Sequence, residues 1–343
     1  MAEYTESWQK LEEALGSRPV LAGTTDELRA AFNGLVAMLV TQYPPASPHV
    51  TTEDGTFGTG AKYRVYTPST LSSPDGPVAV YFHGGGLVLG DLDSEDQLCR
   101  MLAEAAGIVL VSIGYRLAPE DKAPAQVDDG LTGLEWAASN AARLMGQSSY
   151  PTSPNPRLLV IGISAGGGLA LSVTRLVVLG KSTTVRAEQL AGLVALCPMA
   201  LHPDNVPEAV LAASCAGGQA TYSAYTERGE DAAVVNRATM DIFFAAASLD
   251  PGNADAFPAL DTAVYSSAKH YPPTYIGVCE NDPLRDDGRV VAGMLTGGGV
   301  RVKSKLYKGL PHCFWIFPAL PEFSGFVQDT VAGIKWVLQG DKA

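Results

Sequence analysis

The sequence is short of basic residues. It carries 24 Lys and Arg against 36 Asp and Glu, which gives a net charge of −12. Nucleic acids and anionic membranes are bound through a basic face, so we expect neither as a partner. Charged residues are only 17% of the chain and hydrophobic residues 46%. This composition excludes intrinsic disorder and is typical of a folded chain.

Cysteines are also few, and no two of them have Cys-x-x-Cys spacing. The five are Cys99, Cys197, Cys215, Cys279 and Cys313. We therefore expect neither a disulfide framework nor a zinc site. No apolar run reaches the roughly 18 residues that a membrane span needs. The acidic residues 1–8 do not resemble a secretory signal. We expect a cytoplasmic protein with reduced thiols, no membrane span and no metal.

Short apolar runs alternate with segments of helical periodicity. The runs are residues 78–82, 108–112, 158–161, 193–196 and 275–278, and residues 62–66 alternate like a half-buried strand. Helical patterns begin at a capping box on Ser94, before Val127, after Ser164 and before Val327. This alternation predicts an α/β fold, with a mostly parallel central sheet and helices on both faces.

The two remaining parts of the chain have a different pattern. Residues 1–45 predict two helices, the second capped by Thr25, and residues 44–60 predict a loop. Residues 199–236 are loop-like and break the alternation. An insertion there would lie over the carboxyl ends of the strands, where α/β proteins bind ligands. We expect the main domain in residues 46–198 and 237–343.

The strongest chemical signal is Gly162-Ile-Ser-Ala-Gly166, between a predicted strand and a predicted helix. Gly-x-Ser-x-Gly at such a turn is typical of a nucleophile elbow, which exposes the serine hydroxyl above the sheet. The N–H of Ala165 would then point at the reacting oxygen. The Gly-x-Ser-x-Gly pattern alone also occurs in ordinary turns. The predicted strand before it and the predicted helix after it favour a nucleophile elbow.

A second glycine-rich segment, His83-Gly-Gly-Gly86, follows another predicted strand. Consecutive glycines allow several free N–H groups to face one point, as in an oxyanion hole. The alternative is a flexible loop without a function. His83 precedes these donors, so we interpret it as a residue that orients the loop.

A serine nucleophile needs a base, and the base needs an orienting carboxylate. Of the five histidines, His312 follows the last predicted strand, residues 302–307, in a Gly/Pro loop. Asp282 follows the strand that ends at 278 and is our candidate carboxylate. Glu280 and Asp286 are its rivals.

Together these segments resemble the hormone-sensitive-lipase-like branch of α/β-hydrolase esterases. The resemblance covers roughly residues 60–340. It rests on residues 83–86, Tyr115-Arg-Leu-Ala-Pro-Glu120, 162–167, Asp282-Pro-Leu-Arg-Asp286 and Gly309-Leu-Pro-His312. It implies a triad of Ser164, Asp282 and His312, and oxyanion donors at Gly84, Gly85, Gly86 and Ala165. It also implies a cap built from residues 1–45 and 199–236. The pattern is similar to esterases of fungal secondary metabolism, such as those that deacetylate versiconal hemiacetal acetate.

Two residues depart from the family pattern. Ile163 stands where the family usually has Asp or Thr, and Cys313 stands where it usually has Gly. Both departures are expected to reshape the acyl pocket. The other residues expected to line the substrate pocket are Leu87, Val88, Tyr222, Tyr225 and Phe314.

The resemblance therefore implies a serine carboxylesterase that hydrolyses short-chain acyl esters of small molecules without metal or cofactor. The alternative from another class is a hydrolase-fold ligand-binding protein or receptor. Amidase, lactonase and acyl-transfer activities remain open among enzymes, and a homodimer is one alternative for the oligomeric state.

Overall fold

The computed structural model describes residues 3–73, 76–146, 156–208, 210, 222–266 and 270–339. Most of residues 209–221, in the middle of the predicted insertion, lie outside these ranges, as does Cys215.

The core is one eight-stranded sheet with the order β1-β2-β4-β3-β5-β6-β7-β8. The strands are β1 (Val50–Thr56), β2 (Lys62–Pro68), β3 (Val78–Phe82), β4 (Val109–Gly114), β5 (Leu158–Ile163), β6 (Leu190–Leu196), β7 (Thr274–Asn281) and β8 (Val302–Pro311). The β1–β2 and β2–β4 pairs are antiparallel, and all other pairs are parallel. Strands β3, β5 and β6 are buried along their whole length, as their continuous apolar runs predict.

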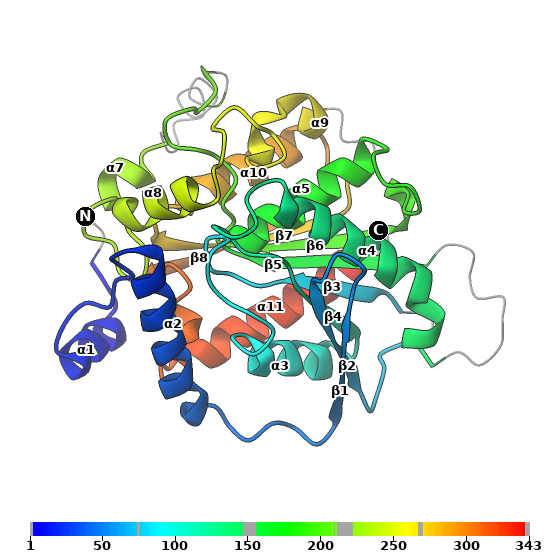
Figure 1. Ribbon diagram of the computed structural model, residues 1–343, viewed down its shortest axis with the longest axis horizontal. Helices are drawn as coiled ribbons and strands as arrows, with labels where there is room; N and C mark the ends of the chain where they lie inside the picture. The colour runs from blue at the N-terminus through cyan, green and yellow to red at the C-terminus, as the bar shows by residue number, and fades with distance from the viewer. Residues whose placement is uncertain are drawn as a thin grey trace.

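Helices cover both faces of this sheet (Figure 1). They are α1 (Glu6–Leu15), α2 (Thr25–Leu39), α3 (Asp96–Ala106), α4 (Ala125–Leu144), α5 (Ala165–Val178), α7 (Ala224–Arg228), α8 (Arg237–Ala246), α9 (Thr262–Ser266), α10 (Arg285–Gly297) and α11 (Glu322–Leu338). Short 3-10 turns are η1 (Val40–Gln42), η2 (Ala187–Gln189), η3 (Pro258–Leu260) and η4 (Phe314–Ile316). Helices α3 and α11 pack on one face, and α4, α5 and α10 on the other. The predicted fold class is confirmed.

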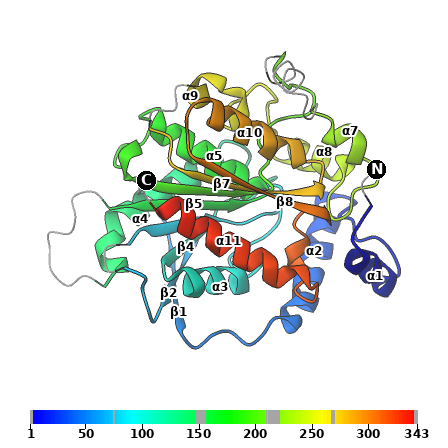
Figure 2. The same cartoon turned by 180° about the vertical axis from the view of Figure 1, so that it is seen from behind.

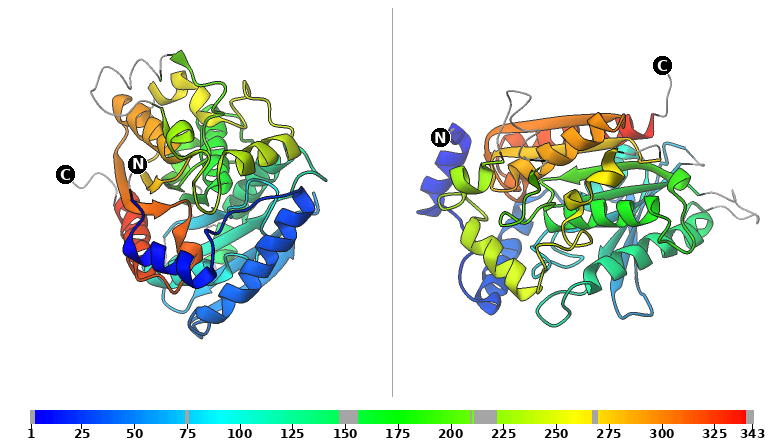
Figure 3. Two further views of the ribbon diagram at one scale, coloured as in Figure 1. Left: turned by 90° about the vertical axis from the view of Figure 1, so that its left-hand side faces the viewer. Right: turned by 90° about the horizontal axis from the view of Figure 1, so that it is seen from above.

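Helices α2, α7 and α8 lie at the end of the sheet toward which β7 and β8 point (Figure 2). Figure 3 shows from two further sides that α1 and α2 gather beside this end. Arg29 of α2 is tied to the segments that follow β3 and β4, because its guanidinium donates to the carbonyl oxygens of Val88 (3.1 Å) and Ala118 (2.7 Å). The same guanidinium forms a bidentate ion pair with Glu120.

Three local predictions were wrong. Residues 50–56 form β1 instead of a loop, because pairing with β2 stabilises a strand that is mostly exposed and polar. The cap of α2 is Thr24 and not Thr25, and its hydroxyl accepts from the N–H of Glu27. Helix α3 begins after Glu95, and Ser94 makes no capping box because its hydroxyl donates to Asp91.

Candidate active site

Ser164 lies at a sharp turn between β5 and α5. Its φ of 56° and ψ of −121° are uncommon for a residue with a side chain. The turn requires glycine at position 162, since a Cβ there would lie 2.0 Å from the carbonyl oxygen of Gly166. The N–H of Ser164 donates to the carbonyl of Leu196 on β6 (2.8 Å). The turn therefore holds the serine hydroxyl at the carboxyl end of the sheet.

A chain of hydrogen bonds joins Ser164, His312 and Asp282. The Nε2 of His312 lies 2.8 Å from the Oγ of Ser164, and its Nδ1 lies 2.7 Å from Oδ2 of Asp282. The other oxygen of Asp282 accepts from the N–H of Leu284 (2.8 Å), which fixes the carboxylate in place. All three side chains are buried. A carboxylate on Nδ1 leaves Nε2 free to accept the serine proton.

The rival carboxylates have other partners. Glu280 accepts from the N–H of Gly309 (2.8 Å). Asp286 accepts from the N–H groups of Ser223 (2.9 Å) and Ala224 (2.8 Å). The structure therefore brings Asp282, and neither of its rivals, onto His312.

The surroundings of His312 make its imidazole a stronger base. Burial alone would lower the pKa of the imidazole, but the Asp282 carboxylate raises it above its ordinary value, and Cys197 acts in the same direction. Cys197 also lies 3.5 Å from Cys279, sulfur to sulfur. Within the described ranges, Cys197, Asp282 and His312 form the one group whose ligand atoms could hold a metal ion. Asp282 and His312 are already hydrogen-bonded to each other, and His312 is also bonded to Ser164.

The glycine loop faces Ser164 from the end of β3. Gly85 has a φ of +117°, and a Cβ there would lie 2.2 Å from the carbonyl oxygen of Leu89, so only glycine fits. The N–H groups of Gly85 and Gly86 donate to no described residue. The N–H of Gly84 instead donates to Oε1 of Glu95 at 3.2 Å. This contact occupies one of the four expected oxyanion donors.

His83 faces its own loop. Its Nδ1 lies 2.7 Å from the carbonyl oxygen of Gly84, and its ring stacks on Tyr115 with 4.2 Å between centroids. The Tyr115 hydroxyl donates to the carbonyl oxygen of His83 at 2.8 Å. These contacts agree with an orienting role for His83.

A cavity of about 270 Å³ opens above Ser164. Its floor is formed by residues 84–86, Ile163, Ser164, His312 and Cys313, and α2 covers it with Ala31, Phe32, Leu35, Val36 and Leu39. Its other walls are Phe243 of α8 and residues 315–317. Asp93 and Glu95 are the carboxyl residues of the lining, and no described Lys or Arg lines it.

Five of the expected pocket residues do not line this cavity. Leu87 faces a separate small cavity near Pro124, and the carbonyl of Val88 binds Arg29. The hydroxyl of Tyr222 donates to Asp287 at 2.7 Å. Tyr225 and Phe314 are buried in the core. The sequence could not show which of these side chains face the cavity and which face the core, because that depends on the backbone conformation of the loops that carry them.

Glu95 is the residue that sequence reasoning missed. The Ser94 capping pattern assigned the neighbouring residues to a helix start, whereas the Glu95 side chain turns under the glycine loop and lines the cavity. Tyr81 donates to its other oxygen. Burial raises the pKa of Glu95 to about 7, although the Tyr81 and Gly84 hydrogen bonds lower it.

Comparisons with known proteins identify the family and its fold. Residues 79–316 match a protein family described as having the alpha/beta hydrolase fold. The versiconal hemiacetal acetate esterase of Dothistroma septosporum is 37% identical over 98% of this chain and 95% of that enzyme. The carboxylesterase NlhH of Mycobacterium tuberculosis is 32% identical over 82% of each chain. A Pyrobaculum calidifontis esterase structure superposes with a TM-score of 0.78, at 28% identity, over 97% of this chain and 98% of that one.

The chain belongs to this α/β-hydrolase family, in its hormone-sensitive-lipase-like branch. At the level of enzyme class, it is a carboxylic ester hydrolase. None of the described helices is both long and apolar enough to span a bilayer.

Proposed function

We propose that this enzyme hydrolyses short-chain acyl esters of small molecules through an acyl-enzyme on Ser164. The observation that carries the proposal is the hydrogen-bonded chain from Ser164 through His312 to Asp282. In the first step, His312 takes the hydroxyl proton at Nε2 while Oγ attacks the ester carbonyl. Asp282 stabilises the imidazolium. The same proton then passes to the alcohol oxygen as that group leaves.

The oxyanion of the tetrahedral intermediate would be bound by the N–H groups of Gly85, Gly86 and Ala165. Gly84 is left out of this set because its N–H is directed at Glu95. One such donor is typically worth about 3 kcal/mol in the transition state. Water then attacks the acyl-enzyme, His312 takes its proton, and the carboxylic acid leaves as Ser164 is restored.

The cavity supports a neutral, small ester as substrate. Its lining is largely apolar and holds carboxyl groups without a described Lys or Arg. A substrate carboxylate would enter without a cationic partner and would be unfavourable. Two relatives similar to this chain along most of its length are named for an acetate ester. We propose an acetate or another short acyl group on an uncharged alcohol.

We propose further that α2 acts as part of a cap. Phe32, Leu35 and Leu39 of this helix line the same cavity as Ser164. An apolar cover excludes water and strengthens the contacts to the oxyanion. Residues 1–45 and the described parts of 199–236 would then form the cap, and the rest of the chain the catalytic domain.

The test is hydrolysis of a nitrophenyl ester series from acetate to decanoate. We expect kcat/KM to be highest for the short acyl chains. Ser164→Ala should lose several orders of magnitude, because members of such a triad act as one unit. Hydrolysis by Ser164→Ala at the wild-type rate, or no hydrolysis of any ester by the wild type, would contradict the proposal.

A further inference from the structure

A partly buried carboxyl group contacts the first residue of the glycine loop. Glu95 precedes the first residue of α3, but its side chain makes no capping bond to that helix. Its Oε1 accepts from the N–H of Gly84 (3.2 Å) and its Oε2 from the hydroxyl of Tyr81 on β3. Glu95 therefore joins three elements of the site: β3, the loop and the start of α3.

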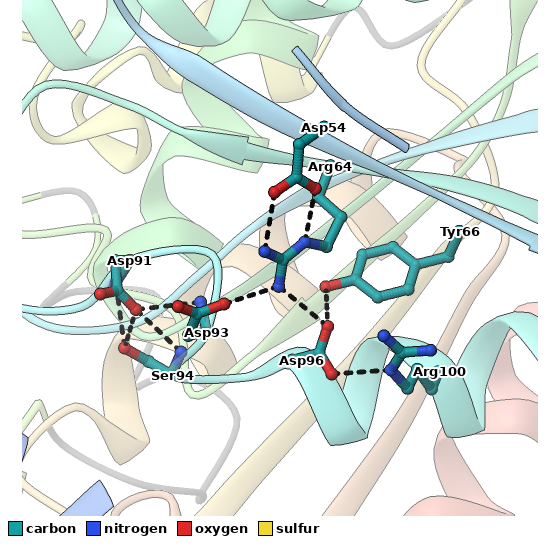
Figure 4. Close-up of polar contacts among 8 residues, drawn as sticks. All are labelled: Asp54, Arg64, Tyr66, Asp91, Asp93, Ser94, Asp96 and Arg100. Carbon is teal, nitrogen blue, oxygen red and sulfur yellow. Dashed lines mark hydrogen bonds and ion pairs between the residues drawn. The ribbon is translucent and has the colours of Figure 1, made fainter. Parts of the chain in front are cut away.

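The residues on either side of Glu95 are held by a network of ion pairs around Arg64 of β2 (Figure 4). Arg64 donates from Nη1 to Asp93 (2.7 Å) and to Asp96 (3.0 Å). Its Nε and Nη2 bind Asp54 of β1 at 2.7 and 2.8 Å. Positions 93 and 96 are thus fixed to the sheet, which leaves the backbone of Glu95 little freedom.

Further contacts tighten the same segment. Asp96 also accepts from the Tyr66 hydroxyl (2.9 Å) and from Nε of Arg100 (2.7 Å). Asp91 accepts from the hydroxyl and the N–H of Ser94, at 2.8 and 2.9 Å. The figure shows this turn beside the Arg64 pairs (Figure 4). Residues on both sides of Glu95 are consequently held by side-chain contacts.

The contact with Gly84 bears on the loop as a whole. Gly84 precedes Gly85 and Gly86, whose N–H groups are directed to no described partner. Glycine gives the backbone more conformational freedom than any other residue, so three in succession need an external contact to hold one conformation. Donors that stabilise an oxyanion must be fixed within a fraction of an ångström. Glu95 supplies that contact at the first glycine.

Glu95 has no basic partner among the described residues, although Asp93 and Asp96 beside it both have one. Placing a carboxyl group away from water and without a basic partner costs free energy unless its oxygens are hydrogen-bonded. Both oxygens are bonded here, and one bond goes to the loop at the reacting centre. Helix α3 alone would not require this arrangement, because its first turn is not capped by Glu95.

We propose that Glu95 is a positioning residue that fixes the glycine loop through Gly84 and so aligns the N–H groups of Gly85 and Gly86 with the oxyanion. This inference rests on the proposed esterase mechanism for its kinetic consequence. Its structural half, an ordered loop held by Glu95, is measurable without turnover.

The experiment compares Glu95→Gln and Glu95→Ala with the wild type. The Gln amide oxygen can still accept from Gly84, whereas Ala removes the acceptor. For an acetate ester, Glu95→Ala should lower kcat about 10- to 100-fold, which is less than the loss of a whole oxyanion donor would cause. KM should stay within about threefold of the wild-type value. Glu95→Gln should remain within about fivefold of wild-type kcat. A trifluoromethyl ketone, which forms a tetrahedral adduct, should bind Glu95→Ala more weakly by the factor lost in kcat.

The second measurement is hydrogen exchange of residues 82–90. Exchange should be faster in Glu95→Ala than in the wild type, and close to wild type in Glu95→Gln. The control is Glu135→Ala, which removes a carboxylate that binds the N–H of Thr183 (2.8 Å) far from the site. This control should leave kcat, ketone affinity and loop exchange unchanged.

The outcomes separate the two claims. A wild type without ester hydrolysis would contradict the proposed function, and loop exchange would still decide the structural half of the inference. An active wild type with unchanged kcat and unchanged loop exchange in Glu95→Ala would overturn the role of Glu95. Equal losses in Glu95→Gln and Glu95→Ala would also overturn it, because retention of the acceptor would then not matter.

Discussion

The indole of Trp8 in α1 packs edge-on against Phe317, with ring centroids 5.4 Å apart and 78° between the planes. Phe317 lines the cavity above Ser164. The N-terminal segment is therefore attached to the wall of the site by a fully buried aromatic pair. Helix α2, which follows α1, provides the cavity with its apolar cover.

The first prediction tests this cover. Leu35→Ala removes apolar surface from the cavity lining contributed by α2. It should lower kcat/KM for a bulky alcohol ester roughly 5- to 50-fold, as expected for a lost apolar contact, and change the value for a minimal acetate ester much less. The control is Leu15→Ala in α1, where the side chain is 39% exposed. Equal losses on both esters would show that α2 does not contact the substrate.

A second prediction concerns the Arg64 network. Arg64→Gln leaves Asp54, Asp93 and Asp96 close together without their shared cation. We expect faster hydrogen exchange in residues 91–96 and a lower kcat. Arg143→Gln is the matched control, since Arg143 pairs with Glu53 of β1 outside the Arg64 network and both side chains are exposed (48% and 60%). An exposed ion pair contributes little, about 0–1 kcal/mol, so this control should behave like the wild type. A similar loss in both variants would contradict a special role for the 91–96 segment.

The third prediction is a pH dependence of stability. Burial raises the pKa of Glu95 from 4.5 to about 7 in the folded protein. Between these values the unfolded chain has released the proton and the folded chain still holds it. The contribution of Glu95 to the free energy of unfolding is therefore fully present below about pH 4.5. It is lost as the pH rises through about 7. Urea unfolding should show Glu95→Gln gaining stability relative to the wild type from pH 4.5 to 7.5. A pH-independent difference would contradict this shift.

The fourth prediction concerns charge on the substrate. The pentanoate and the glutarate monoester of nitrophenol have acyl chains of similar length, and the second carries a terminal carboxylate. Because Asp93 and Glu95 line the cavity and no described Lys or Arg does, the glutarate ester should react at least about tenfold more slowly, as for an uncompensated charge. Comparable kcat/KM values for the two esters would contradict the proposed preference for neutral esters.

Much of this architecture could be predicted because its signals are local. The runs at 78–82 and 158–161 are continuous and apolar, and each lies in a strand buried along its whole length. The Gly162-x-Ser-x-Gly166 spacing determines the turn, since a Cβ at position 162 would overlap the backbone. Strand β1 was missed because its sequence is polar and its stability comes from pairing with β2.

The parts of the site that sequence could not supply depend on long-range contacts. Glu95 contacts Gly84 from a segment that Arg64, some 30 residues earlier, binds on both sides of it. Cys197 and Cys279 come within 3.5 Å because β6 and β7 are neighbours in the sheet. Neither contact produces a periodicity or a motif spacing in the sequence from which it could have been predicted.

The central claim is that Ser164 is the nucleophile, and covalent labelling tests it most directly. The enzyme is incubated with an aryl phosphonate that releases nitrophenolate, and the modified peptide is identified by mass spectrometry. We predict one equivalent of nitrophenolate, one adduct on Ser164 and loss of turnover in proportion to labelling. Ser164→Ala should release none. An adduct on another residue, or ester hydrolysis that persists after full labelling of Ser164, would contradict the account.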